Sequence, residues 1–162
     1  MKIATVVTLV VAAVLFATMA RVQKGLGLSD FRFGSAWTYG VDTLRTNIDK
    51  DRSKPPLVVV PLLFPLDFLF LIFLGLFLAL CSITYADALG VPPAHRWLLL
   101  VLPVAYMVAD FSENVLYSGM LLWQDSIGKL ICAAQWATRV KWVAVAFATL
   151  QALGAFVLSW FR

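Results

Sequence analysis

Four long runs of hydrophobic residues, separated by more polar segments, organise the chain. They cover residues 3–20, 57–82, 97–123 and 142–160, approximately. Each run is close to the ~20 apolar residues that an α-helix needs to cross a bilayer. The pattern therefore predicts an all-α polytopic membrane protein, in which a bundle of four transmembrane helices forms a single domain over residues 1–162.

The composition supports a lipid environment. Hydrophobic residues make up 62% of the chain, charged residues only 14%, and the mean hydropathy is +0.88. A soluble domain of this size does not need so much apolar surface, so we expect the lipid bilayer to be the main partner. The net charge of +4 does not indicate nucleic-acid binding, because the basic residues gather in two segments between the hydrophobic runs.

Those two basic segments predict the topology. Residues 21–56 and 124–141 contain most of the Lys and Arg residues of the chain. The positive-inside rule places such loops in the cytoplasm, which indicates a multi-pass protein of a bacterial inner (plasma) membrane. The run at 3–20 also resembles a signal peptide, with Thr18 and Ala20 at the small-residue positions of a cleavage site. We expect a retained helix instead, because cleavage would export the basic segment that follows.

An amphipathic pattern lies between the first two runs, at residues 30–48. Ser29 or Asp30 is suited to cap a helix there. This pattern has two interpretations, a helix lying in the headgroup region and a loop packed over the bundle. Its apolar positions fall on one helical stripe: Phe33, Trp37, Val41, Leu44 and Ile48.

The third run carries polar groups near its middle. At 100° per residue, Asp110, Glu113 and Asn114 share one face of a helix with Tyr106 and Tyr117. A carboxylate that faces lipid is costly, so these acids must face protein, water or a bound cation. We expect at least one of them to be protonated.

Two other runs carry isolated polar residues. Asp67 is the only charge in the second run, and it follows Pro61 and Pro65, which free backbone carbonyl groups in a helix. Asp67 has no partner on its own helix, so we expect one on the acidic face of the third helix, near mid-membrane. In the last run, Gln151 can donate a hydrogen bond to a neighbouring helix, and Lys141 lies at the edge of the same face.

Cysteine and histidine are too few for the usual Cys/His zinc sites or for bis-histidine haem ligation. We expect Cys81 and Cys132 to lie near opposite membrane surfaces, beyond disulfide reach. His95 lies in a predicted turn at residues 83–96, and we expect it to be exposed. No phosphate loop, dinucleotide fingerprint or Ser/His/Asp set is present.

The motifs D-x-x-E-N and T-x-x-K-W, together with the lone Asp of the second run, resemble those of small bacterial four-helix integral membrane proteins of uncharacterised role. The resemblance implies an architecture and no particular activity. The residues that carry it are Asp67, Asp110, Glu113, Asn114, Thr138, Lys141 and Trp142.

Three interpretations of the acids remain open. They fix helix packing through hydrogen bonds, they bind or transform a ligand, or they carry protons or a hard cation. The sequence favours ligand binding or support of a larger membrane assembly, with a membrane-protein partner or a second copy of the chain. An enzyme that acts on a lipid-like substrate by acid–base chemistry is the first alternative, and a proton or cation pathway the second.

The sequence identifies no particular cofactor. The candidate site residues are Asp67, Tyr106, Asp110, Glu113, Asn114, Tyr117, Lys141 and Gln151. If a metal ion binds, the oxygen ligands would be Asp67, Asp110, Glu113 and Asn114, a set suited to Mg²⁺, Ca²⁺, Mn²⁺ or Na⁺.

Overall fold

All regular secondary structure is helical in residues 2–28 and 41–160, the parts of the chain that the computed structural model describes. The elements, in order, are α1 (Lys2–Gly25), α2 (Val41–Lys50), α3 (Lys54–Leu57), the π-helical segment η2 (Val58–Asp67), α4 (Phe68–Leu89), the 3₁₀ segment η3 (Pro93–Leu100), α5 (Val101–Leu122), the 3₁₀ turn η4 (Gln124–Ser126) and α6 (Ile127–Trp160).

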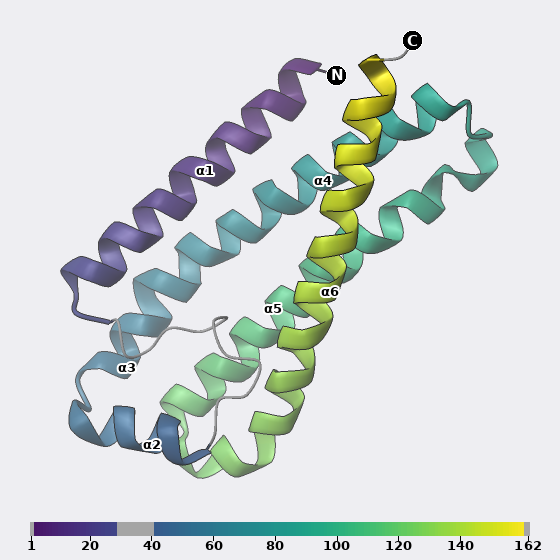
Figure 1. Ribbon diagram of the computed structural model, residues 1–162. Helices are drawn as coiled ribbons and strands as arrows, with labels where there is room; N and C mark the ends of the chain where they lie inside the picture. Colours follow the sequence, from purple (N-terminus) through teal and green to yellow (C-terminus); the bar gives the residue numbers. More distant parts are fainter. Residues whose placement is uncertain (1, 29–40, 161–162) are drawn as a thin grey trace.

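Four stretches are long and apolar enough to cross a membrane: Ile3–Gly25, Lys54–Thr84, Pro93–Leu122 and Gln124–Leu158. Helices α5 and α6 pack against each other, α4 contacts both of them, and α1 packs against α4 (Figure 1). The predicted all-α bundle with four membrane-length apolar helices is therefore confirmed.

The connection between α4 and α5 is tighter than predicted. The sequence indicated a loop at 83–96, but α4 continues to Leu89 and η3 begins at Pro93. Gly90 ends α4 because it adopts the left-handed conformation (φ 67°), which a residue without a Cβ accepts most easily. The turn is fastened by an ion pair between Arg96 Nη1 and Asp87 Oδ1 at 2.6 Å. His95 is exposed there, as predicted.

The sequence marked residues 124–141 as a polar connection in which a helix could begin at Ser126 and run on into the last span, and the structure confirms that helix. Only η4 separates α5 from α6, which then runs unbroken for 34 residues. The reason is a buried stripe at helical spacing, formed by Ile127, Ile131, Ala134 and Thr138. Lys129 lies on the exposed side of the same turns. The basic residues of this segment therefore belong to a helix and not to a loop.

The two prolines interrupt the second span as expected. Val60 (φ −130°, ψ 120°) and Phe64 (φ −125°, ψ 116°) have extended backbone, the conformation favoured directly before a proline. Regular α-helix resumes only at Phe68. Asp67 thus stands at the junction between the broken segment and α4.

Helix α2 covers one end of the bundle (Figure 1). The predicted amphipathic segment falls partly at residues 29–40, outside the described residues, so the expectations for Ser29, Asp30, Phe33 and Trp37 lie there too. Within α2, Leu44 and Ile48 are buried among α5 and α6 side chains. The segment is therefore helical, as the first interpretation expected, and its helix packs over the bundle, as the second expected of a loop. The hydrophobic cluster under α2, the lower core, comprises Leu28, Leu44, Ile48, Val58, Leu62, Leu63, Tyr117, Met120, Leu121, Ile127, Ile131 and Ala134.

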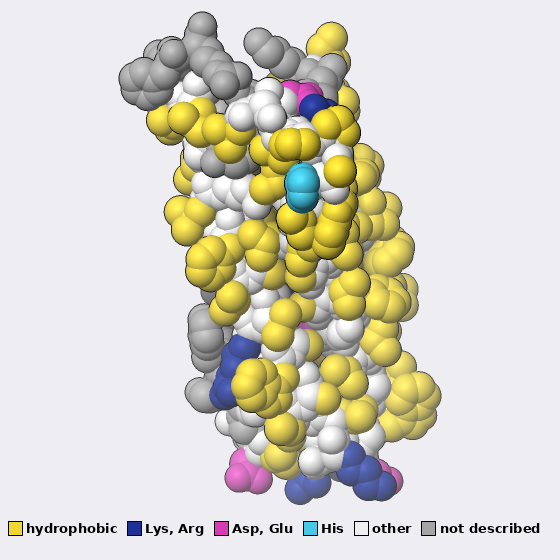
Figure 2. Space-filling model, turned by 90° about the vertical axis from the view of Figure 1, so that its right-hand side faces the viewer, with side chains coloured by type: hydrophobic (Ala, Val, Ile, Leu, Met, Phe, Trp, Pro, Cys, Tyr) yellow, Lys and Arg dark blue, Asp and Glu magenta, His cyan; other side chains and the backbone are white. Residues whose placement is uncertain are grey.

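A second, smaller hydrophobic cluster lies between α4, α5 and α6, and its buried members are Leu78, Tyr106, Ala144 and Ala148. Large apolar side chains also cover much of the surface, where they would face lipid. Figure 2 shows hydrophobic side chains over most of one face, with charged side chains near its top and in its lower part.

Candidate functional site

The polar face of α5 is buried in the bundle. Asp110, Glu113 and Asn114 are 1%, 1% and 4% exposed, whereas Val108 and Val115, on the opposite side of α5, are 61% and 46% exposed. Helical spacing places the three polar side chains together, and packing turns them toward α4 and α6. The predicted shared face is confirmed.

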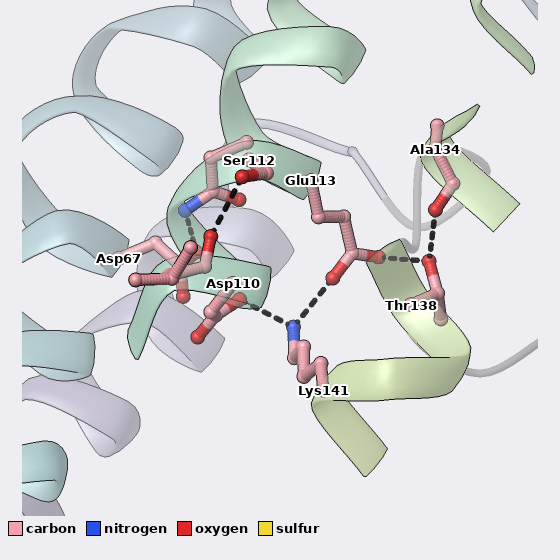
Figure 3. A network of polar contacts seen from close by, with 9 residues as sticks. Asp67, Asp110, Ser112, Glu113, Ala134, Thr138 and Lys141 are labelled. Carbon is pink, nitrogen blue, oxygen red and sulfur yellow. Dashed lines mark hydrogen bonds and ion pairs between the residues drawn. The ribbon is translucent and has the colours of Figure 1, made fainter. Parts of the chain in front are cut away.

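Lys141 of α6 enters this cluster from the neighbouring helix. Its Nζ lies 2.6 Å from Asp110 Oδ1 and 2.8 Å from Glu113 Oε2 (Figure 3). The Lys141 side chain is 18% exposed. The sequence placed this lysine at a helix edge, whereas the structure places its ammonium between two carboxyl groups. Lys141 is thus an internal counter-ion.

Thr138, one turn before Lys141, holds the other oxygen of Glu113. Its Oγ1 lies 2.7 Å from Glu113 Oε1 and 3.0 Å from the carbonyl oxygen of Ala134 (Figure 3). The threonine is itself buried. Both oxygens of Glu113 therefore have partners on α6.

Asp67 joins the cluster from the other side. Asn114 Nδ2 donates a hydrogen bond to Asp67 Oδ2 at 2.6 Å. The expected pairing of Asp67 with the polar face of α5 is confirmed. The contact ties the junction of η2 and α4 to the middle of α5, while the Lys141 contacts tie α5 to α6. We refer to Asp67, Asp110, Glu113, Asn114, Thr138 and Lys141 together as the carboxylate–lysine cluster.

The cluster contains more acid than base. Its three carboxyl groups face a single ammonium, so the fully ionised cluster would carry two net negative charges. Asp110 has both carboxyl oxygens buried; Lys141 Nζ lies 2.6 Å from Oδ1, and the Tyr106 hydroxyl also interacts with this carboxyl group. Buried charge without compensation is strongly unfavourable. The arrangement is therefore suited to hold a proton or another positive charge.

A metal centre fits the geometry less well. Among the described residues, no group of three or more His, Cys, Asp or Glu side chains is placed to hold a metal ion. Lys141 Nζ occupies the position between Asp110 and Glu113 that a cation would take. The expected oxygen set of Asp67, Asp110, Glu113 and Asn114 is therefore not assembled around one point.

The structure separates Gln151 from the carboxylate–lysine cluster. Its Nε2 donates to Ser82 Oγ of α4 and to the Leu99 carbonyl oxygen of η3, the latter at 2.9 Å. Gln151 lies ten residues beyond Lys141, which is ~15 Å along α6. Hydrogen bonding across helices is confirmed for Gln151, and these contacts lie apart from the carboxylate–lysine cluster.

The two tyrosines flank the cluster on α5 and are both buried. Tyr106 belongs to the smaller hydrophobic cluster, and Tyr117 belongs to the lower core. The two cysteines are free, as predicted, with Cys81 on α4 and Cys132 on α6. Sequence reasoning gave Thr138 no role of its own. The available signal was a small polar residue three positions before Lys141, on the buried stripe of α6.

Known proteins give no functional assignment for this chain, so the geometry of the carboxylate–lysine cluster is the basis for one. No family model matches the chain, and searches of curated proteins and of solved structures give no significant match.

Proposed function

We propose that this chain is a small integral membrane protein that works by binding a ligand at the carboxylate–lysine cluster, and that this ligand is a proton. The observation that carries the proposal is the hydrogen-bond pattern at Thr138. One hydroxyl group, with one proton to donate, lies within hydrogen-bond distance of two acceptors, Glu113 Oε1 and the Ala134 carbonyl oxygen.

A proton on Glu113 completes this pattern. Glu113 Oε1 then donates to Thr138 Oγ1, and Thr138 donates to the Ala134 carbonyl oxygen, a common arrangement for threonine within a helix. The other oxygen of Glu113 still accepts from Lys141. Every donor and acceptor around Glu113 is satisfied in this state.

Charge balance favours the same state. With Glu113 protonated, Lys141 neutralises Asp110, and the remaining carboxyl group, that of Asp67, accepts a hydrogen bond from Asn114. Each proton taken up lowers the buried negative charge by one. Proton binding and release at this cluster would support a proton pathway, or a proton-dependent step in a larger membrane assembly.

The proposal is tested by infrared spectroscopy of the protein in lipid vesicles. A protonated carboxyl group has a carbonyl stretching band that an ionised carboxylate lacks. We expect such a band at neutral pH, sensitive to exchange into D₂O, and we expect Glu113→Gln to remove it. Asp125→Asn is the matched control, because Asp125 is an exposed acid in η4 and its replacement should leave the band unchanged.

Absence of the band in the wild-type protein would contradict proton binding. A band that survives Glu113→Gln and disappears in Asp110→Asn or Asp67→Asn would move the proton to another member of the cluster.

A second role is favoured by the way the cluster joins helices. Its contacts tie the start of α4, α5 and α6 together, which is what a rigid support within a larger assembly requires. In that case the Asp110→Asn/Glu113→Gln double variant, which keeps size and hydrogen-bonding capacity, should assemble and function normally. Loss of the biological role in a correctly folded double variant would instead support proton binding.

The sidedness of the protein is part of the proposal. The end of the bundle that holds α2, α3 and the start of α6 carries most of the basic side chains. By the positive-inside rule this end faces the cytoplasm of a bacterial inner membrane.

A further inference from the structure

Each of the four long helices has a stretch without charged side chains, and the four stretches lie on the same side of the carboxylate–lysine cluster. Asp, Glu, Lys and Arg are absent from residues 3–20 of α1, 68–86 of α4, 97–109 of η3 and α5, and 142–160 of α6. Each of these stretches ends near the cluster at one end and near the α4–α5 turn or a chain end at the other. Beyond the cluster the uncharged segments are shorter. Residues 55–66, 114–124 and 130–138 contain 12, 11 and 9 residues, and α1 carries Arg21 and Lys24 there. The cluster thus lies away from the centre of the uncharged region.

The length of these stretches matches a bilayer. Those of α1, α4 and α6 contain 18 or 19 residues, which span ~27–29 Å at 1.5 Å per residue. The hydrocarbon core of a bilayer is about 30 Å thick. The stretch on η3 and α5, residues 97–109, is shorter and spans ~21 Å, even with the larger rise of ~2.0 Å per residue in the 3₁₀ segment.

Side-chain contacts place the four stretches in register. Phe16 of α1 packs against Phe70 of α4 in a tilted arrangement with ring centroids 5.8 Å apart, and Asp67 pairs with Asn114. At the far end, Gln151 joins α6 to Leu99 of η3. The stretches therefore lie side by side and form one uncharged layer (Figure 1).

Residues typical of a membrane interface mark the level of the cluster on the outer surface. Trp136 is 60% exposed, and the Arg139 guanidinium lies 5.3 Å from its ring centroid. Arg21 is exposed on α1, about one turn beyond Phe16. Tryptophan and arginine gather where headgroups meet hydrocarbon. We call these three side chains the interfacial belt.

From this placement we propose that the carboxylate–lysine cluster lies at one boundary of the hydrocarbon core, level with the phospholipid headgroups, and not at mid-membrane. The interfacial belt contacts the phosphate groups of these lipids, to which its two guanidinium groups are complementary. Helices α2 and α3, with the lower core beneath them, form a cap on the aqueous side of the cluster. This placement differs from the sequence-based expectation of a site near mid-membrane.

The consequence for the site is access from one side. An uncharged layer of about 30 Å separates the cluster from the far surface, whereas only the cap separates it from the near surface. Protons or small solutes then exchange with the cluster from the cap side. This inference concerns placement alone and does not depend on proton binding.

The test uses two cysteine variants at equal distances from the cluster. In a background of Cys81→Ser and Cys132→Ser, Ala133→Cys lies eight residues before Lys141 and Thr149→Cys lies eight residues after it, each ~12 Å away along α6. Both native side chains are exposed. The probe is a charged, membrane-impermeant maleimide added to both faces of proteoliposomes by freeze–thaw loading.

We expect Ala133→Cys to react at least tenfold faster than Thr149→Cys, and we expect detergent to remove the difference. A centred cluster predicts that both positions lie inside the hydrocarbon and react equally slowly, which would overturn the proposal, as would equally fast reaction of both. Spin labels at the same positions provide a second readout. The label at position 133 should be relaxed mainly by a water-soluble nickel chelate, and the label at position 149 mainly by oxygen. The reverse pattern, or no difference, would also overturn it. Neither measurement depends on the protonation of Glu113, so this test and the infrared test fail independently.

Discussion

The ammonium of Lys141 lies 2.8 Å from Glu113 Oε2, although 28 positions separate the two residues in the sequence. The contact exists because α6 begins at Ile127 and packs along α5, which brings its fourth turn level with the polar face of that helix. One cation from α6 therefore serves two acids of α5.

Removal of this cation should destabilise the bundle. Lys141→Met leaves Asp110 and Glu113 buried without a counter-ion, and loss of one partner of a buried ion pair costs about 3–5 kcal/mol. We expect a lower unfolding midpoint in detergent, measured by circular dichroism. Lys141→Met/Asp110→Asn should recover part of the loss, and Lys129→Met, at an exposed position of the same helix, should have little effect. Equal unfolding midpoints of Lys141→Met and the wild type would show that the Lys141 ammonium does not stabilise the cluster.

The close approach of α4 and α5 at Gly75 should not tolerate a side chain. A Cβ at this position would overlap Cγ and Sδ of Met107, whereas a Cβ at Gly128 meets open space. We expect Gly75→Ala to lower the free energy of unfolding by about 1–3 kcal/mol, because overpacking forces neighbours to move. Gly128→Ala should be neutral or slightly stabilising. Unfolding in detergent compares the two, and Gly75→Ala/Met107→Ala should recover stability. A neutral Gly75→Ala would mean that Met107 moves aside without cost.

Gln151 should contribute to stability without affecting the carboxylate–lysine cluster. Gln151→Leu removes the hydrogen bonds to Ser82 and to the Leu99 carbonyl oxygen, each worth about 0.6–1 kcal/mol between membrane helices. The unfolding midpoint should fall modestly, while the carbonyl band in the infrared spectrum stays as in the wild type. A change in that band would show that the two polar sites are coupled across ~15 Å of α6.

The turn before α3 should show a small pH dependence of its own. The Ser53 hydroxyl and amide donate hydrogen bonds to Asp51 Oδ1 at 2.6 and 3.0 Å, and they lower the pKa of Asp51 below 3.8. The charged form is favoured by folding, so this contribution is present above the unfolded-state pKa and is lost as the pH falls through the folded-state pKa. NMR titration should show Ser53→Ala raising the pKa of Asp51, with Thr46→Ala as an unaffected control. An unchanged titration in Ser53→Ala would contradict the role of Ser53.

Much of the architecture follows from sequence, because helical periodicity and hydrophobic length are local properties. The four apolar runs predicted the long helices, the spacing of Asp110, Glu113 and Asn114 predicted one polar face, and Pro61 with Pro65 predicted the break before Asp67. The unpaired state of Asp67 on its own helix correctly indicated a partner on α5.

Other features depended on which helices pack together, which no local pattern specifies. The charges of residues 124–141 indicated a polar connection, with a helix start at Ser126 as one option. The extent to which that helix is buried depends on the α5 surface that covers Ile127, Ile131 and Thr138. Helix length and register then placed Lys141 between two acids and carried Gln151 away from them. The sequence by itself determined that buried acids must find partners, because an isolated charge is unfavourable in an apolar medium. Only the tertiary structure decided which groups those partners are, because long-range contacts depend on the relative position of helices that are distant in the chain.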